Sequence, residues 1–538
     1  EIYAVALLGS KSNEKVGLVP CSNGILKRLI SIPSERNKYM LVEELILHFM
    51  PIIFEKYQIK SKSLIRIIRN ADIDVDEAVG VDDEDTDYRD MMEKLIRQRK
   101  KLCPVKMEYS RVLDEKIIHN LCKELNLNHE QIYYSESPLE LSFVFGLQDA
   151  LRNNKNLFYE RHIQKNPSWY VSGKPVISQV EEADRFISYP YESMQPFIRM
   201  LQEAGEDEKV VSIKMTLYRV AKNSQIVESL ISAAENGKEV VVLVELRARF
   251  DEENNIEWSR RLEDAGCRII YGLDYTKVHS KLCLITYREE GQIKYVTQIG
   301  TGNYNEKTSK LYTDLSIITA NKQIGMEAAY VFTRLCMGEF VDETNYLLVA
   351  PKCMKSKILN YMDKEIEIAR NGGKAYVGAK INSLTDKEII DKLIECSKAG
   401  VRVEMIVRGI CCLIPGVKGH TENISVISIV GRYLEHSRVY IFGTPDRDNI
   451  YISSADFMTR NMERRVEIAA PIYDDSIKTR IRNMFHIMEC DTVKARQLCS
   501  DGNYVHRTIA DIKDFTDEEW EQASEGLRIN SQEYFAAR

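Results

Sequence analysis

The sequence of 538 residues predicts an α/β protein in which two related α/β domains follow a mixed α/β head domain. Residues 226–244 align without gaps on residues 389–407, and each segment reads as an amphipathic helix, a glycine turn and a β-branched strand. Two histidine motifs also recur, and the offset between them is nearly the same as the offset between the two aligned segments. Helix alternating with strand is typical of βαβ units, so we expect largely parallel sheets in both copies.

The domain boundaries follow from changes in this pattern. A mixed α/β head domain is expected over residues 1–161, a first α/β domain over 162–346, and a second over 347–538 that ends in a helical C-terminal tail. Turn-forming residues between 161 and 187 mark the first boundary. Because the chain begins at Glu1 rather than Met, we interpret the head domain as N-terminally incomplete.

The head domain combines strand and helix patterns. Apolar runs predict strands within residues 1–9, 15–21 and 64–76. Residues 91–102 read as an amphipathic helix with a basic end. This order differs from the repeated helix–strand units that follow, so we expect the head domain to fold separately from them.

The composition is that of an ordinary globular protein, with 44% hydrophobic and 29% charged residues. A net charge of −7 argues against a nucleic-acid coat protein, although a local basic cleft can still bind a polyanion. No run approaches the roughly eighteen apolar residues of a membrane-spanning helix. The twelve cysteines include no Cys-x-x-Cys pair, so we interpret them as reduced thiols of a cytosolic protein.

The segment VHSKLCLI, residues 278–285, is the most informative stretch. His279 and Lys281 lie two residues apart, so they would project from the same face of a strand. Downstream lies Asn303, and Asp314 follows it by eleven residues. A lone His-x-Lys pair would be weak evidence, because such pairs are common at solvated strand ends.

A second copy of the motif begins at His436, which Arg438 follows two residues later. The first copy has a hydroxyl residue, Thr301, then Asn303 and Asp314. The second copy has the same spacing with Ser454, Asp456 and Glu467. Two copies in register predict a paired functional site.

These residue types suit nucleophilic chemistry on an anionic substrate. Neutral imidazole is a competent nucleophile near pH 7 when an acceptor at its other ring nitrogen holds its tautomer. We predict Asp314 and Glu467 as these acceptors, one in each half for the histidine of the same half. Lys281 and Arg438 would each place a cation beside a histidine.

Further residues are candidates for phosphate binding. Thr301 and Asn303 can donate hydrogen bonds to phosphoryl oxygens. Arg219, Arg249 and Arg408 follow predicted strands, and ligands of open α/β sheets bind at the carboxyl ends of strands. The planar guanidinium group fits phosphate oxygens. The sequence contains no Gly-x-x-x-x-Gly-Lys-Ser/Thr loop, kinase glycine-rich loop or zinc-type ligand cluster.

The paired motifs resemble those of the phospholipase D superfamily. The likeness becomes more specific when they are read together with TLYRVAKNS, VVVLVELRARFDEENN, GTGNYNEKTSKLYTDLS and YISSADFMTRNMERRVE. This set resembles the long, histidine-phosphorylated polyphosphate kinase family over essentially the whole chain. The resemblance implies two tandem phospholipase D-like α/β domains after the head domain. It also implies an ATP:polyphosphate phosphotransferase that works reversibly with Mg²⁺.

At the matching positions, the resemblance makes His279 the phosphorylated nucleophile. It gives His436 an acid/base or phosphate-stabilising role with a contact to ATP, and it places Tyr312 and Arg408 against the nucleotide. These assignments come from the family and not from the spacing of the residues.

The family's magnesium position falls on Arg219 and Arg249. Arginine has no lone pair for a metal, so we interpret both residues as phosphate clamps beside the ion. The expected partners are ATP or ADP and inorganic polyphosphate, with no nucleic acid, in a homo-oligomer. We expect a cytoplasmic protein, with peripheral association with a membrane left open.

Two alternatives remain open on the sequence. One is a phospholipase D-like phosphodiesterase that uses water or an alcohol as acceptor; Tyr312 and Arg438, in place of a second lysine, count against it. The other is an inactive scaffold that binds polyanions. The presence of both histidines in intact sequence context counts against that scaffold.

Overall fold

The computed structural model describes residues 1–10, 13–21, 27–33, 38–70, 102–246, 252–273, 276–508 and 528–537. Two compact units make up this part of the chain, Glu1–Arg161 and His162–Arg538. Two predicted features lie outside the described residues, namely Arg249 and nearly all of the helix expected over 91–102.

The first unit is built on a sheet that, within the described ranges, has the strand order β2–β1–β5–β6–β7. Its strands are β1 (Ile2–Ser10), β2 (Asn13–Pro20), β5 (Gln58–Arg69), β6 (Pro104–Tyr109) and β7 (Ile132–Tyr134). Successive residues of β1 point to opposite faces, so Ala4 packs with α1 (Val42–Ile53) and Val5 packs with α3 (Glu115–Leu125). Both faces of β1 are covered, which explains its continuous apolar run.

The strands expected in the head domain are confirmed. β1 and β2 form an antiparallel hairpin, and β5 contains the strand predicted from residue 64, although it begins six residues earlier and ends at Arg69. The remaining described elements of this unit are β3 (Leu29–Ser31), β4 (Tyr39–Leu41), η2 (His129–Gln131), α4 (Phe143–Ala150) and η3 (Lys155–Leu157).

The first half of the second unit carries a mixed sheet with the order β11–β10–β9–β13–β14–β15–β20, and β8 pairs with β15. These strands are β8 (Arg185–Tyr189), β9 (Val210–Leu217), β10 (Glu239–Val244), β11 (Arg268–Ile270), β13 (Leu282–Glu289), β14 (Gln292–Gly300), β15 (Tyr312–Thr319) and β20 (Leu434–Glu435). The accompanying helices are α5 (Val176–Glu182), α6 (Gln195–Glu206), α7 (Gln225–Glu235), α8 (Glu252–Asp264), η4 (Thr308–Lys310) and α9 (Lys322–Cys336).

The expectation of largely parallel sheets is wrong for part of this half. β9, β10 and β11 are parallel, whereas β13 runs antiparallel to β9 and β14, and β14 runs antiparallel to β15. The cause is local: Glu290 and Gly291 both have positive φ, at 50° and 77°, and form a two-residue turn between β13 and β14. Such turns match the twist of a hairpin and force antiparallel pairing.

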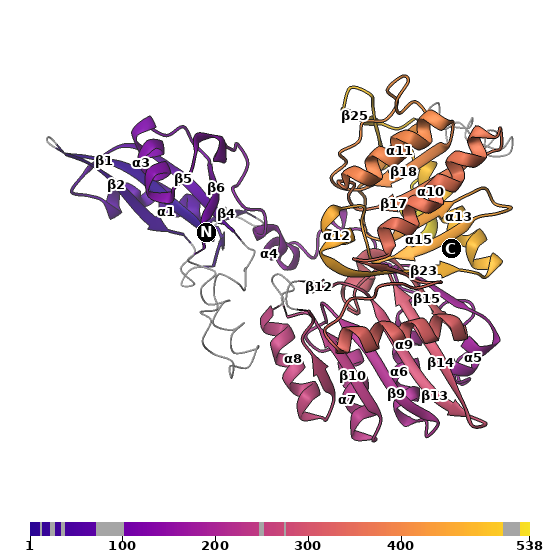
Figure 1. The fold of residues 1–538 in the computed structure, drawn as a ribbon. Helices are drawn as coiled ribbons and strands as arrows, with labels where there is room; N and C mark the ends of the chain where they lie inside the picture. The colour runs from indigo at the N-terminus through magenta and orange to yellow at the C-terminus, as the bar shows by residue number, and fades with distance from the viewer. Residues whose placement is uncertain are drawn as a thin grey trace. The chain divides into compact units, whose positions relative to one another are not determined.

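The second half repeats this plan in a sheet with the order β12–β23–β22–β21–β17–β18–β19–β24–β25, and β16 pairs with β23. These strands are β12 (Lys277–Val278), β16 (Leu348–Ala350), β17 (Tyr376–Ile381), β18 (Arg402–Val407), β19 (Ile424–Ile429), β21 (Arg438–Phe442), β22 (Asn449–Ser453), β23 (Arg465–Ile472), β24 (Ala495–Leu498) and β25 (Tyr504–His506). The helices are α10 (Met354–Arg370), α11 (Lys387–Ala399), α12 (Thr459–Glu463), α13 (Asp475–Glu489) and α15 (Ser531–Ala537). α10 and α11 lie side by side over this sheet (Figure 1).

The predicted helical tail is only partly right. α13 and α15 are helical, but β24 lies between them and pairs with β19, and β25 extends the same sheet. Among the described residues of this tail, β24 and β25 therefore complete the second sheet.

The two halves exchange short strands. β12 comes from the first half of this unit but pairs with β23 in the second sheet, and β20 comes from the second half of the unit but pairs with β15 in the first sheet. Figure 1 shows β12, β15 and β23 at the junction of the magenta and orange halves. One buried core also spans the junction, since Leu282 and Phe332 belong to the same cluster as Ile441 and Ile468.

A first prediction concerns the close packing of α9 on β14. A Cβ added at Gly325 would lie 2.3 Å from the Cβ of Tyr295. The methyl group fits only if α9 or β14 moves, so Gly325→Ala should destabilise the second unit by about 1–3 kcal/mol. The midpoint of urea unfolding, followed by circular dichroism, measures this loss.

Gly146→Ala is the matched control. Gly146 also lies in a helix, α4, but its added Cβ would meet only the Cδ2 of Leu29 at 3.9 Å. Alanine favours a helix over glycine by up to about 1 kcal/mol, so this variant should be neutral or slightly stabilised. An equal loss of unfolding free energy in both variants would show that the close packing at Gly325 is not the cause of its destabilisation.

Candidate active site

The two histidine motifs lie where the chain crosses from one sheet to the other. β12 ends at Val278 and β13 begins at Leu282, so His279 lies in an irregular step and not within one continuous strand as predicted. The backbone N–H groups of His279 and Ser280 both donate to the carbonyl of Val466, at 2.9 Å. This pairing carries the first motif into the second half.

The second motif makes the reciprocal crossing. β20 ends at Glu435, and the backbone N–H of His436 donates to Oγ1 of Thr313 at 3.2 Å. β20 and β15 pair in parallel, with Leu434 opposite Tyr312. Each histidine is thus anchored beside a strand of the other half, His279 beside β23 and His436 beside β15.

The crossing overturns the predicted pairing of histidines with carboxylates. His279 Nδ1 lies 2.9 Å from Oε2 of Glu467, and His436 Nδ1 lies 2.9 Å from both carboxylate oxygens of Asp314. Each histidine is therefore oriented by the carboxylate of the opposite half, and not by that of its own half. The equal spacing in the two copies cannot reveal this, because it does not show which strand each motif pairs with.

Each carboxylate is held by a hydroxyl of its own half. Thr301 Oγ1 donates to Oδ1 of Asp314 at 2.6 Å, and Ser454 Oγ donates to Oε2 of Glu467 at 2.5 Å. The predicted phosphate-binding role of Thr301 is wrong for this reason: its hydroxyl is fully buried and already committed to Asp314. At Gly302 an added Cβ would lie only 2.1 Å from Oδ2 of Asp314, so only glycine fits there.

Burial and positive charge set the protonation state of His279. Burial lowers the pKa of His279 well below its ordinary value, and the charges of Lys281, Arg465 and Arg438 lower it further. The imidazole is therefore neutral at pH 7. With Glu467 accepting at Nδ1, the ring proton lies on Nδ1 and the lone pair of Nε2 is available for attack.

His436 has a different electrostatic setting. Burial lowers its pKa too, but the negative charge of Asp314 opposes that shift. Burial alone would raise the pKa of Asp314, whereas its contacts with His436 and Thr301 hold that pKa below the ordinary value. An imidazole with an ionised carboxylate at Nδ1 is suited to donate or accept a proton at Nε2.

The other predicted residues gather around one or the other histidine. The Tyr312 ring centroid lies 5.3 Å from that of His436. Arg408 Nε donates to Oδ1 of Asn382 at 3.2 Å, and Asn382 Nδ2 donates to the carbonyl of His436 at 3.3 Å. The Cζ of Arg219 lies 5.7 Å from the centroid of the Tyr218 ring.

Tyr218 was missed by the sequence reasoning. Its ring meets the imidazole of His279 edge to face, with centroids 4.9 Å apart, and Nζ of Lys281 lies 5.4 Å from its centroid. The ring therefore forms one wall of the His279 site. The only sequence signal was its place beside Arg219 at the end of a predicted strand.

A buried polar network behind His436 was missed as well. Lys380 Nζ lies 3.0 Å from the carboxylate of Glu435, and Thr313 Oγ1 donates to the same carboxylate at 2.8 Å. Gln532 of α15 donates to it at 2.6 Å. The C-terminal helix thereby braces the strand that leads into the second motif.

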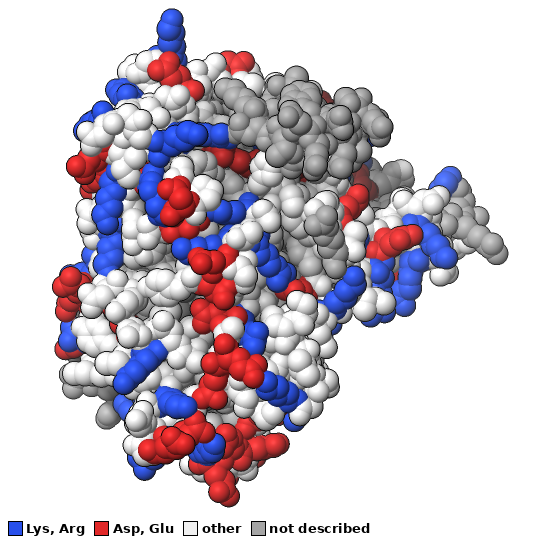
Figure 2. Space-filling view, turned by 90° about the vertical axis from the view of Figure 1, so that its right-hand side faces the viewer, with Lys and Arg blue, Asp and Glu red and all other residues white. Residues whose placement is uncertain are grey.

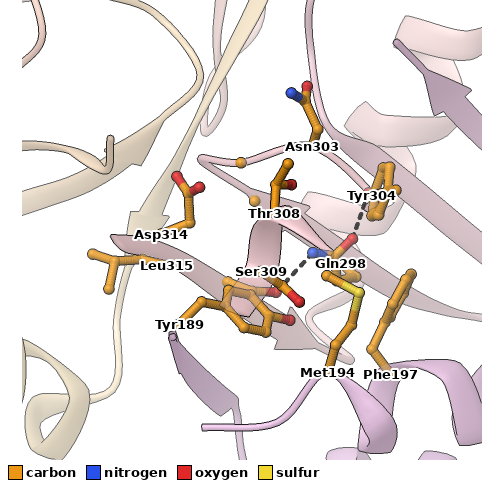
Figure 3. Close-up of a pocket in the computed structure, with 13 residues that line it drawn as sticks. Tyr189, Met194, Phe197, Gln298, Asn303, Tyr304, Thr308, Ser309, Asp314 and Leu315 are labelled. Atoms are coloured by element: carbon orange, nitrogen blue, oxygen red, sulfur yellow. Dashed lines mark hydrogen bonds between the residues drawn. The ribbon is translucent and has the colours of Figure 1, made fainter. Parts of the chain in front are cut away.

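Figure 3 shows Asn303, Thr308 and Asp314 on one side of a small cavity, with Tyr189, Met194 and Phe197 on the other. The cavity has a volume of about 10 Å³, which is enough for about one water molecule. It cannot hold a nucleotide. The Oδ1 atom of Asn303 is buried there without a hydrogen-bond partner.

The face shown in Figure 2 carries groups of acidic side chains as well as basic ones. A cleft of about 780 Å³ beside α5 and α6 is lined by two basic side chains, Arg199 and Lys209, and by an excess of carboxylates, namely Glu181, Glu203, Glu206, Asp207 and Glu289. A polyanion would be repelled there. The buried cations around the two histidines are the better place for one.

The described part of the chain holds neither a metal-ligand cluster nor a membrane-spanning helix. There, no group of three or more His, Cys, Asp or Glu side chains could hold a metal ion. Across the same residues, no helix combines the length and apolarity needed to cross a bilayer. Arg219, which the resemblance places in the magnesium region, cannot act as a ligand.

Comparison with known proteins identifies the family. Residues 1–147 match the polyphosphate kinase middle domain, 175–339 match its C-terminal domain 1, and 347–517 match its C-terminal domain 2. The polyphosphate kinase of Bacillus anthracis is 40% identical over 509 residues, which cover 94% of this chain and 72% of that protein. The chain belongs to the polyphosphate kinase family.

Two further relatives agree with this family. The polyphosphate kinase of Bacillus cereus is 41% identical over 500 residues, covering 92% of this chain and 70% of that protein. The crystal structure of polyphosphate kinase from Porphyromonas gingivalis has a TM-score of 0.79 at 28% identity and covers 100% of this chain and 77% of that chain. The predicted architecture, a mixed α/β head domain followed by two α/β domains, agrees with the three matched family models. The family also decides against the phosphodiesterase and scaffold alternatives.

The crossed carboxylates lead to a second prediction. Glu467→Gln should slow phosphorylation of His279 on the order of 10²-fold or more, because the imidazole loses the acceptor that holds its tautomer. Asp314→Asn should instead disturb His436, so the His279 phosphoenzyme still forms while turnover falls. Rapid-quench labelling with γ-³²P-ATP measures both. If Asp314→Asn slowed phosphorylation of His279 and Glu467→Gln did not, each histidine would instead be oriented by the carboxylate of its own half.

Proposed function

We propose that this polyphosphate kinase transfers the γ-phosphoryl group of ATP reversibly to inorganic polyphosphate through a phosphohistidine at Nε2 of His279. One observation carries this proposal: the imidazole is buried and neutral, its Nδ1 faces Glu467, and cations surround it. A neutral nucleophile among cations suits a phosphate donor whose negative charge must be stabilised as it transfers.

In the first step, the lone pair of His279 Nε2 attacks the γ-phosphorus. The N–P bond forms as the bond from that phosphorus to the β–γ bridging oxygen breaks, and the electron pair leaves with ADP. The proton on Nδ1 stays in its contact with Glu467. Lys281, which is fully buried two residues away, supplies positive charge close to the reacting nitrogen.

In the second step, a terminal phosphate oxygen of polyphosphate attacks the phosphorus of the phosphohistidine. The new O–P bond forms as the N–P bond breaks, and its electron pair returns to Nε2 of His279. Two displacements through one nucleophile let donor and acceptor use the same cationic site in turn. Run in reverse, the same steps make ATP from ADP.

We assign His436 to the leaving or attacking oxygen. Asp314 holds its Nδ1, which leaves Nε2 to exchange a proton or hydrogen bond with that oxygen. Tyr312 and Arg408 border this histidine, so the nucleotide would bind on this side of the site. Asn303 and Arg219 would serve the phosphates on the His279 side.

Mg²⁺ would enter with the nucleotide. Because the residues named by the family resemblance include arginines and the described carboxylates form no metal cluster, the fit to a protein-held ion is poor. Mg²⁺ usually keeps several waters and binds through substrate phosphates. Arg219 and Arg249 then act on phosphate oxygens and not on the metal.

The remaining proposals concern organisation. We keep residues 1–161, 162–346 and 347–538 as functional domains and propose a homo-oligomer acting in the cytoplasm on ATP and polyphosphate, with no nucleic-acid partner. The cytoplasmic assignment rests on the use of ATP and on the twelve cysteines, all of which are free thiols.

A third prediction tests the nucleophile. His279→Ala should abolish the acid-labile, base-stable phosphoprotein formed from γ-³²P-ATP, and with it synthesis of acid-insoluble polyphosphate. His436→Ala should lose turnover and still bind ATP. Full labelling of the His279→Ala protein would assign the phosphoryl group to another residue.

A fourth prediction concerns the phosphate clamp. Arg219→Ala should lower kcat on the order of 10²-fold with little change in nucleotide affinity, because charge on the transferring group is greatest in the transition state. Arg219→Lys should recover only part of the rate, since its point charge cannot replace the planar fork. Steady-state kinetics with polyphosphate as acceptor check this; wild-type kcat in Arg219→Ala would remove the residue from the site.

A further inference from the structure

The two halves differ in how their motif cations are neutralised. In the second half, Arg438 Nε and Nη2 donate to the two oxygens of Asp456 at 3.2 and 3.0 Å. Its Nη1 donates to the carbonyl of His436 at 2.8 Å and contacts that of Thr301 at 3.3 Å. Every nitrogen of this guanidinium group is occupied, and its charge faces a buried carboxylate.

Lys281 stands in the equivalent place of the first half without such a partner. Its Nζ donates to the carbonyl of His279, and the ring centroid of Tyr218 lies 5.4 Å away. Among the residues that the structure describes, none places a carboxylate within 4.0 Å of this ammonium group. An ammonium group has three N–H donors, so Lys281 retains capacity for an anion.

The residue equivalent to Asp456 is Asn303. Both lie eleven residues before the carboxylate that faces a histidine, and both follow by two residues the hydroxyl that holds that carboxylate. In the first half an uncharged amide therefore stands at the sequence position that a carboxylate has in the second half, and its Oδ1 is buried without a hydrogen-bond partner.

We propose that Asn303 determines which half receives the phosphoryl group. Its neutral side chain leaves the charge of Lys281 for the phosphoryl group on His279, whereas Asp456 pairs with Arg438 and leaves His436 without a free cation to hold a covalently bound phosphoryl group. The inference rests on the proposed phosphohistidine mechanism and makes Asn303 a positioning residue for charge, not a nucleophile or a metal ligand.

The electrostatics of the two cations agree with this assignment. Burial lowers the pKa of Lys281 to about 7. Burial also opposes the charge of Arg438, but Asp456 holds the pKa of that group above its ordinary value. A cation without a carboxylate partner responds strongly to an incoming dianion; one in a closed ion pair does not.

Several charged groups face Lys281 and bear on its titration. Glu467 and Asp314 favour its charged form, and Arg438 and Arg465 oppose it. His279 and Tyr218 complete the surroundings and are uncharged at pH 7. The positive form of Lys281 is complete at pH values below its pKa and is lost as the pH rises through it, so phosphoenzyme formation should fall on the alkaline side of pH 7.

The test is Asn303→Asp in the full chain. The new carboxylate should lower the rate of His279 labelling by γ-³²P-ATP on the order of 10²-fold, because it repels the phosphoryl group. It should also raise the pKa of Lys281 and move the alkaline limb of the pH–rate profile to higher pH. Asn303→Ser is the matched neutral control and should keep that limb at its wild-type position, whatever its effect on rate.

Inorganic tripolyphosphate provides a second readout by calorimetry. Asn303→Asp should weaken its binding at least tenfold, and Asn303→Ser should weaken it less. If Asn303→Asp does not fold, Lys281→Met and Arg438→Met decide the question, since the lysine variant should lose more labelling than the arginine variant. Equal effects of Asp and Ser at 303, or greater loss in Arg438→Met, would overturn the inference.

Failure of the mechanism itself would look different. Wild-type enzyme that makes polyphosphate without a labelled His279 would refute the proposed function. Wild-type enzyme that is labelled, with an Asn303→Asp profile unchanged in both rate and pH limb, would refute only the role of Asn303.

Discussion

The pairing of two short strands with the opposite sheet is the interaction on which the site depends. β12 and β20 contain only two residues each, yet they carry both histidines across the junction. Each of these strands pairs with the opposite sheet through only two residues, and such short pairing would be weak by itself. They persist because they lie over a core shared by both halves and because the backbone N–H groups of Val278 and His436 have hydrogen-bond partners. Packing far from the histidines therefore determines their position.

Burial of so many charged side chains is unfavourable unless hydrogen bonds and ion pairs offset their desolvation. Asp314, Glu467 and Asp456 each accept several hydrogen bonds or face a cation, as buried carboxylates must. The Lys380–Glu435 pair is closed by hydroxyl and amide donors in the same way. Lys281 lacks a carboxylate partner in the described structure, which is consistent with a group kept ready for an anionic substrate.

Much of this was accessible from the sequence, and the limits are physical. The repeat, the two motifs and the candidate residues follow from local spacing, and the family resemblance follows from their combination. The crossed contacts of His279 and His436 could not be predicted, because spacing within a copy says nothing about pairing between strands. The antiparallel strands were missed for a related reason: the turn at Glu290 and Gly291 was outweighed by the helix–strand alternation. Tyr218 carried no signal apart from its neighbour.

The exchanged strands also bear on how the enzyme comes into being. His279 contacts Glu467, which lies 188 residues later in the chain, and Asp314 contacts His436, which lies 122 residues later. During synthesis, a first half that has already folded on the ribosome lacks both its carboxylate and the strand that β12 must join. Such a nascent chain carries His279 without the carboxylate that orients it. The ability to consume ATP therefore arises only after the second half has been made and has docked, late in folding.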